Sequence, residues 1–253
     1  MNGLFPARRS GVAGQAPSLL LALETALPAP TVALLRDAEP VGEIALPATR
    51  PLSEQLLPGI DALLALSGST LEEVDAFAVS IGPGSFTGIR VGVATVKGLA
   101  FGGTPPVAPI STLTALACAA GRPGDTVAAV LDARRGEVYA GAYELTHAEP
   151  CCVLPDGLYG VRDLAARLPA ACLLVGDGAP LLADASSAAL GGKLQILAQA
   201  LVRPRASHVG RLGHALLAKG NGVRAAELAP RYLRRAEAEA RRTGERLDPP
   251  PLF

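Results

Sequence analysis

Residues 79–103 of this chain read VSIGPGSFTGIRVGVATVKGLAFGG, and this stretch indicates the fold more clearly than any other. It opens with the end of an apolar run, residues 76–81, that is typical of a buried strand. Residues 82–84 end that strand, because glycine tolerates positive φ and proline has no amide proton. Ser85 or Thr87 can accept a hydrogen bond from a first-turn amide, so we expect one of them to cap the helix that follows.

The helix predicted over residues 87–101 carries almost no charge. Its charged side chains are Arg90 and Lys97, which are seven residues apart and therefore on one face. The rest of its surface includes small residues, whose side chains project little from the helix: Gly88, Gly92, Ala94 and Gly98. Because small side chains let a second helix approach the backbone closely, we interpret this as a contact helix.

Four blocks of the sequence together resemble one protein family. The most specific is SIGPGSFTGIRVGVATVKGLA at residues 80–100, and the others are LLALETA at 20–26, LDARRGEVYAGAYE at 131–144 and APRYLRRAEAEA at 229–240. In kind and in order they are similar to the TsaB family, also called YeaZ. The resemblance extends over residues 19–240, nearly the whole chain.

The resemblance implies an α/β fold of the actin-like, Hsp70-like (ASKHA) superfamily, built from two RNase H-like subdomains with mixed sheets flanked by helices. It implies a non-catalytic, cytoplasmic subunit of the machinery that attaches threonylcarbamoyl to adenosine 37 of tRNA. The implied partners are a TsaD-like catalytic homologue, in a heterodimer, and a TsaE-like ATPase in a larger complex. Contact with tRNA would come only through the complex, and a homodimer is the alternative when the chain is alone. No cofactor or metal is implied.

Two predicted helices supply the implied docking surface. The first starts at Ser53, and its leucine and isoleucine residues recur at three- and four-residue spacing. Two such helices could meet two helices of a partner in a four-helix contact, or they could simply cover their own sheet. The residues expected at the partner contact are Leu56, Ile60, Leu63, Gly88, Val91, Gly92, Thr95 and Leu99.

The pattern along the chain predicts two subdomains. In the first, the order is three strands, helix, strand, helix, strand and helix, with the last helix starting at Ser111; hairpins followed by crossovers favour a mixed sheet. In the second, we predict a hairpin, a helix over 161–168, a strand over 172–175 and a helix capped by Ser207. The predicted divisions are a flexible extension (1–18), two subdomains (19–122 and 123–240) and a Pro-rich tail (241–253).

Composition narrows the class of protein. The chain has 23 basic and 23 acidic residues in 253, so it has no global attraction to nucleic acid or to an anionic membrane. Although 49% of its residues are hydrophobic, no uncharged run is long enough to cross a bilayer. The four cysteines fit neither zinc nor thioredoxin spacing, which favours buried thiols in a reducing compartment.

The glycine-rich turn also suggests an anion or nucleotide loop at Gly84, Ser85 and Thr87. A helix N-terminus with free amides can hold an anion. The spacing fits neither the dinucleotide fingerprint nor a Walker loop, however. We therefore favour a structural turn that packs the helix on the strand, and expect at most weak anion binding there.

The alternative function is an enzyme: a small-molecule kinase of the actin-like superfamily or a metallopeptidase-like hydrolase. Glu24, where the family more often has aspartate, and Asp132 each follow a hydrophobic strand, where an actin-like fold can hold a nucleotide-bound metal. For Asp132 we favour a salt bridge or cap with Arg134 or Arg135. His208 and His214 are six residues apart, which does not place both on one helix face for a metal. We predict no catalytic residue and no metal site.

The end of the chain is rich in arginine. Six arginines stand against three glutamates: Arg231, Arg234, Arg235, Arg241, Arg242 and Arg246 against Glu237, Glu239 and Glu245. A helix would place several of these arginines near one side, which suggests a weak contact with RNA phosphates. The alternative is a solvated helix with arginine–glutamate pairs, which we favour because charge runs are usually exposed surface.

Overall fold

The structure, a computed structural model, describes residues 16–147, 149–169, 171–186, 195–196 and 203–234. The chain divides into two compact units, residues 1–112 with 204–230 and residues 113–203 with 231–253. Of the predicted flexible extension only residues 16–18 are described, and the predicted tail over 241–253 lies outside the described residues.

The first unit is built on a five-stranded mixed sheet in the order β3-β2-β1-β4-β5. Its strands are β1 (Leu19–Glu24), β2 (Thr31–Arg36), β3 (Glu39–Ala45), β4 (Ala76–Gly82) and β5 (Val107–Ser111). β1, β2 and β3 form the two consecutive antiparallel hairpins that the sequence predicts. β4 and β5 then add in parallel on the other side of β1. The reversal of order between β1 and β4 makes their carboxyl ends the topological switch point of the sheet.

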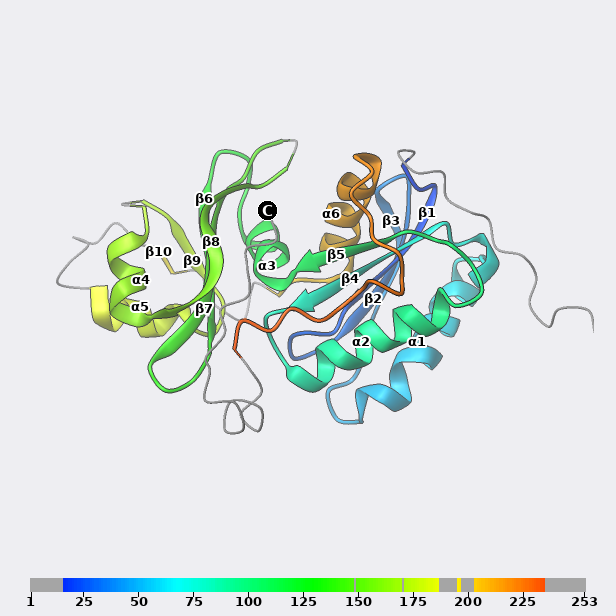
Figure 1. Ribbon diagram of the computed structural model, residues 1–253, viewed down its shortest axis with the longest axis horizontal. Helices are drawn as coiled ribbons and strands as arrows, with labels where there is room; N and C mark the ends of the chain where they lie inside the picture. Colours follow the sequence, from blue (N-terminus) through cyan, green and yellow to red (C-terminus); the bar gives the residue numbers. More distant parts are fainter. Residues whose placement is uncertain (1–15, 148, 170, 187–194, 197–202, 235–253) are drawn as a thin grey trace, which may run out of the picture. The chain divides into compact units, whose positions relative to one another are not determined.

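Helices cover both faces of this sheet. Figure 1 shows α1 (Leu52–Leu66) and α2 (Phe86–Leu99) on one face and α6 (Ala206–Ala218) on the other. A short 3₁₀ turn, η1 (Leu71–Glu73), leads into β4. Because side chains alternate along a strand, Leu19, Leu21 and Leu23 enter the core under α1 and α2. The alternate residue Ala22 lies against Gly210 of α6.

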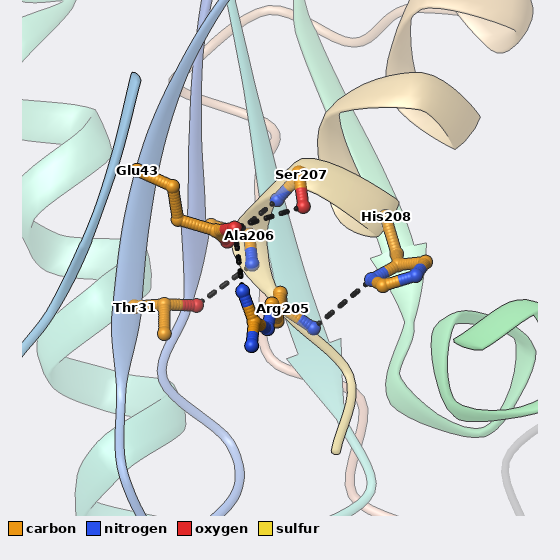
Figure 2. A network of polar contacts seen from close by, with 6 residues as sticks. All are labelled: Thr31, Glu43, Arg205, Ala206, Ser207 and His208. Carbon is orange, nitrogen blue, oxygen red and sulfur yellow. Dashed lines mark hydrogen bonds and ion pairs between the residues drawn. The ribbon is translucent and has the colours of Figure 1, made fainter. Parts of the chain in front are cut away.

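The N-terminus of α6 is capped by the sheet on which it packs (Figure 2). The amide of Ala206 donates to Thr31 Oγ1 at 2.7 Å, and the amide and hydroxyl of Ser207 donate to the two carboxylate oxygens of Glu43, each at 3.1 Å. The predicted capping role of Ser207 is therefore wrong, because the N-cap is Arg205 and the Ser207 hydroxyl is used by Glu43. A carboxylate at this helix end also satisfies the helix dipole.

His208 completes that network from the first turn of α6. Its Nδ1 accepts a hydrogen bond from the Arg205 amide at 3.3 Å. Burial lowers the pKa of His208; the positive charges of Arg211 and Arg205 act in the same direction, and Glu43 opposes them. The site thus favours a neutral, capping imidazole.

The second unit contains another five-stranded mixed sheet, in the order β10-β9-β6-β7-β8. Its strands are β6 (Thr126–Asp132), β7 (Glu137–Glu144), β8 (Cys151–Gly160), β9 (Leu173–Val175) and β10 (Gln195–Ile196), and its helices are α3 (Thr112–Ala120), α4 (Val161–Arg167) and α5 (Ala179–Ser186). The β6–β7 hairpin forms as the sequence predicts. β8 was not predicted, since its sequence contains Pro155 and Gly157 and its pairing with β7 is irregular.

The unit boundaries differ from those that the sequence predicts. Residues 204–230 belong to the first unit, although we expected a continuous second subdomain over 123–240. The reason is that α6 packs on β1, β2, β4 and β5, and Val223 then pairs with Val107 at the edge of the first sheet. The first break also comes earlier, after residue 112.

Candidate functional site

The switch point at the carboxyl ends of β1 and β4 carries a buried polar cluster. Glu24 ends β1 and is 1% exposed, Thr25 follows it at 1%, and Ser80 near the end of β4 is 0% exposed. The Thr25 amide donates to Ser80 Oγ at 3.2 Å. Glu24 Oε1 accepts from the amides of Ala26 at 2.8 Å and Leu27 at 3.3 Å. The cluster therefore organises the chain as it leaves β1.

Glu24 is an unusual carboxyl group. Its second oxygen, Oε2, is buried without a well-formed hydrogen bond from any described residue. Burial raises the pKa of Glu24 to about 7, against the lowering effect of hydrogen bonds from Ala26, Ser80 and Leu27. Desolvation outweighs those bonds because the charged form loses its hydration.

The glycine-rich turn after β4 is closed by this same loop. The Ser85 amide donates to the Ala26 carbonyl at 2.7 Å, and a Cβ on Gly84 would overlap that carbonyl oxygen. Gly84 has φ +154°, and the Gly82–Pro83 peptide is cis. Ser85 Oγ accepts from the Gly88 amide at 3.2 Å, which confirms Ser85 as the cap of α2. The turn thus packs helix on strand, and of the predicted anion loop Gly84, Ser85 and Thr87 are exposed at its surface.

Two residues predicted at the partner contact face this chain's own sheet. A Cβ on Gly88 would overlap the Thr25 carbonyl oxygen, and one on Gly92 would overlap Thr25 Oγ1. Both glycines are buried. The prediction that Gly88 and Gly92 contact a partner is therefore wrong: their smallness serves the close approach of α2 to the end of β1.

The predicted contact residues of α1 are also internal. Leu56, Ile60 and Leu63 are 1%, 1% and 2% exposed, and they belong to the core of the first unit. Their three- and four-residue spacing identifies the buried stripe of an amphipathic helix. We correct their assignment from partner contact to core.

The surface that remains is the outer face of α1 and α2, together with the loop after α2. Large apolar side chains are exposed there: Leu57 (49%), Leu66 (82%), Phe86 (39%) and Phe101 (86%). Val91, Thr95 and Leu99, also predicted at the contact, are half-buried, and Val91 and Leu99 pack against the core from its rim. Arg90 stacks over the Phe86 ring at 3.8 Å from its centroid. We call this the outer α1/α2 face.

Sequence reasoning missed the exposed apolar residues of that face. Leu57 stands three and seven residues before the buried Ile60 and Leu64, and Phe86 stands three and seven residues before the buried Ile89 and Val93. Periodicity alone therefore assigns both side chains to the buried stripe, and local spacing gives no signal of their exposure.

In the second unit, Asp132 stands at the carboxyl end of β6. Its Oδ1 accepts from the Arg134 amide at 2.7 Å, and its Oδ2 lies 3.2 Å from Arg134 Nη1. The predicted cap and salt bridge with Arg134 are therefore confirmed. The Asp132 amide in turn donates to Asp177 Oδ1 at 2.9 Å, which links the ends of β6 and β9.

The described arginines of the C-terminal block form hydrogen bonds and ion pairs within the second unit. Arg231, 8% exposed, pairs with Asp156 at 2.8 Å, and Asp156 also accepts from the Tyr143 hydroxyl. Arg234 donates to the Ala133 carbonyl at 2.6 Å and pairs with Glu137. Residues 231–234 are not helical, so the helix expected here, which we favoured as a solvated one, is wrong for this part. The other predicted tail arginines, from Arg235 onward, lie outside the described residues.

Metal-ligating groups do not gather in the part of the chain that the structure describes. No group of three or more His, Cys, Asp or Glu residues there could hold a metal ion. Burial raises the pKa of Cys118 and Cys172 to about 11, so these thiols stay protonated. The described helices include none with the length and apolar character of a membrane span.

Comparisons with known proteins agree with the sequence blocks. The family described as TsaD, tRNA N6-adenosine threonylcarbamoyltransferase, matches residues 46–242. A tRNA threonylcarbamoyladenosine biosynthesis protein TsaB from Bacillus subtilis is 31% identical over 226 residues, covering 88% of this chain and 96% of that protein. The protein of the same name from Haemophilus influenzae is 50% identical over 124 residues, 47% of this chain and 51% of that protein. The match thus spans about half of the H. influenzae relative, as it does for the Escherichia coli protein at 54%.

A solved structure shows the same fold. YeaZ from Pseudomonas aeruginosa superposes with a TM-score of 0.73 at 31% identity, over 85% of this chain and 100% of that one. The predicted α/β fold with mixed sheets flanked by helices is confirmed, and it is the fold of YeaZ.

Proposed function

This chain belongs to the TsaB (YeaZ) family, and from that premise we propose that it is a non-catalytic partner subunit in the biosynthesis of N6-threonylcarbamoyladenosine at adenosine 37 of tRNA. The observation that carries the proposal is the outer α1/α2 face. It exposes large apolar side chains on two neighbouring helices of a well-packed unit. Exposed apolar clusters of this kind mark protein contact sites.

The proposed partner is a TsaD-like catalytic homologue. The outer α1/α2 face exposes large apolar side chains at Leu57, Leu66 and Phe101, and small residues at Ala94 and Gly98 of α2. Large groups on one helix that fit over small residues of another allow two helices to pack closely on two others. Arg90, stacked on Phe86, adds a cation at the edge of the apolar area.

The proposed role is non-catalytic because the polar residues considered for chemistry are used inside the fold. Ser85 Oγ caps α2, and Glu24 Oε1 accepts two backbone amides of the loop after β1. Asp132 holds the Arg134 turn through both carboxylate oxygens. Each of these roles supports a scaffold, because each side chain holds backbone groups of its own turn.

Other features of the proposal come from the family. A TsaE-like ATPase would join a larger complex, tRNA would be contacted only through that complex, and the chain alone would form a homodimer through the same face. The proposed compartment is the cytoplasm, and no cofactor is proposed. The exposed position of the outer α1/α2 face supports the shared use of one surface for both kinds of dimer.

A co-purification experiment tests the proposal. We expect the chain to co-elute with the TsaD-like homologue from the same cells, and Ala94→Trp to abolish co-elution, because overpacking a close helix contact separates the helices. Ala218→Trp, at an exposed end of α6, is the matched control and should leave co-elution intact. Unchanged affinity in a folded Ala94→Trp variant would place the interface elsewhere. Failure of the wild type to bind the homologue would overturn the proposed partnership.

A further inference from the structure

We propose that Glu24 is a positioning residue for α2, and that the charge on its buried carboxyl controls how firmly the outer α1/α2 face is held. The part of this inference that concerns partner binding rests on the proposed function; the part that concerns α2 itself does not.

Hydrogen bonds connect the Glu24 carboxyl group to the start of α2. Glu24 Oε1 fixes the loop after β1 through the amides of Ala26 and Leu27. The Ala26 carbonyl then accepts the Ser85 amide at 2.7 Å, immediately before α2 begins. The carboxyl therefore reaches the helix cap through two successive hydrogen bonds.

The loop after β1 also contacts the body of α2. The Thr25 carbonyl lies against Gly88 and its side chain against Gly92, in both cases too close for a Cβ. The Thr25 amide is held in turn by Ser80. Because the helix rests on residue 25 with no spare volume, a displacement of residues 25–27 moves α2 as well.

The residues around the Glu24 carboxyl group determine which charges it meets. Glu24 lies on the α6 face of the sheet, since Ala22, two residues earlier, contacts Gly210 of α6. Its cross-strand neighbour Thr31 is uncharged, and its other neighbour on β4 is Ser80. The charged groups at the start of α6 and on β3 pair with one another: Arg205 with Glu43 (Figure 2), and Arg211 with Glu39. The titratable His208 accepts the Arg205 amide. None of these groups is among the causes that shift the pKa of Glu24.

The Glu24 carboxyl group is therefore more stable inside the fold when it is protonated than when it is ionised. Oε2 has no well-formed hydrogen bond among the described residues, and burial brings the pKa of Glu24 to about 7. An ionised Oε2 gains most from water, which reaches it when residues 25–27 open. Opening those residues releases the Ala26–Ser85 bond and loosens α2.

Hydrogen exchange of the full chain, measured alone at pH 6.0 and pH 8.5, tests the positioning role. Glu24→Gln is the neutral comparison, and comparing variants at one pH cancels the intrinsic pH dependence of exchange. We expect the α2 amides of the wild type to exchange faster than those of Glu24→Gln at both pH values, and this difference to grow about tenfold between pH 6.0 and pH 8.5, because opening lets residue 24 ionise at its ordinary pKa. Amides of β6 and β7 serve as an internal reference and should not differ.

Two further comparisons keep the test decisive. Glu43→Gln, which removes a carboxylate that contacts α6, should leave the α2 ratio unchanged. If Glu24→Gln does not fold, the wild type still tests the idea, because protection of α2 relative to β6 and β7 must fall between the two pH values. A wild-type ratio that stays constant from pH 6.0 to pH 8.5 overturns the proposal.

The affinity for the TsaD-like homologue, measured at the same two pH values, tests the link to docking. We expect weaker binding of the wild type at pH 8.5 and a smaller change in Glu24→Gln. Equal wild-type affinity at both pH values, with α2 loosened at pH 8.5, overturns the docking part of this inference. Absence of binding at either pH overturns the proposed partnership, whereas the exchange result still decides the role of Glu24 in α2.

Discussion

Thr25 and Gly92 are in contact so close that no side chain fits between them. Thr25 Oγ1 occupies the space that a Cβ of residue 92 would need, although the two residues are 67 positions apart in the chain. This contact seats α2 on the end of β1. It also explains why small residues alternate with large ones along the inner face of the helix.

Gly92→Ala should therefore destabilise the protein. The new methyl group forces α2 away from Thr25, and overpacking of this kind costs about 1–3 kcal/mol of the free energy of unfolding. Gly98→Ala on the same helix is the matched control: nothing lies within 4 Å of its added Cβ, so helix propensity should stabilise it by about 0.5–1 kcal/mol. Urea denaturation measures both. Equal effects of the two substitutions would contradict the close contact.

The stability of the protein should fall as pH rises through the range in which Glu24 ionises. The folded-state pKa of Glu24, about 7, is above the ordinary value of 4.5. Its protonated form therefore stabilises the fold fully below pH 4.5, and this contribution is lost as pH rises towards 7. The loss is on the order of 3 kcal/mol at neutral pH.

Denaturation of wild type and Glu24→Gln at several pH values isolates this contribution. His208 has the opposite effect, because its lowered pKa makes stability rise with pH near 6.5, so the difference between the two proteins is the quantity to follow. We expect that difference to change progressively between pH 4.5 and pH 7 and to level off above pH 7. A difference that does not vary with pH would show that Glu24 keeps an ordinary pKa.

Breaking the buried pair between Arg231 and Asp156 should be costly. Both side chains are almost fully buried, at 8% and 6% exposed, and the Tyr143 hydroxyl also donates to Asp156. Arg231→Met leaves an unpaired carboxylate inside the second unit, at a cost of about 3–5 kcal/mol. The double variant Arg231→Met with Asp156→Leu should lose less than the sum of its single variants. Additive losses in denaturation experiments would mean that the pair does not act as a unit.

The positions of the main elements of the first unit follow from local sequence patterns. Short, nearly continuous apolar runs place β1 and β2, and the glycine-rich turn with Ser85 places the start of α2. The assignment of inner and outer faces did not follow. In the sequence, Gly88 and Gly92 suggest a helix surface without side chains that a partner helix could approach. In the structure, Thr25 fills the space beside both glycines, and local periodicity does not reveal this neighbour.

Long-range polar contacts account for the other differences. Arg231 and Arg234 are part of a run of charge that resembles solvated surface, but their partners Asp156 and Glu137 lie 75 and 97 positions away. Serine is a residue type that often caps helices, but the hydroxyl of Ser207 donates a hydrogen bond to Glu43 of β3. In each case a partner brought by the fold outcompetes the local interaction that the sequence suggests.

These contacts sharpen the prediction that the isolated protein binds tRNA weakly. The chain has no net charge, and the two described arginines of the C-terminal block are held by Asp156 and Glu137. Binding through phosphates depends on cations that are free to displace counterions, so a salt titration should show a low affinity and a shallow slope. Arg235→Gln with Arg242→Gln tests the remaining arginines without disturbing the internal pairs. Tight binding by the wild type, with a steep salt slope that flattens in this variant, would show instead that the C-terminal region contacts RNA directly.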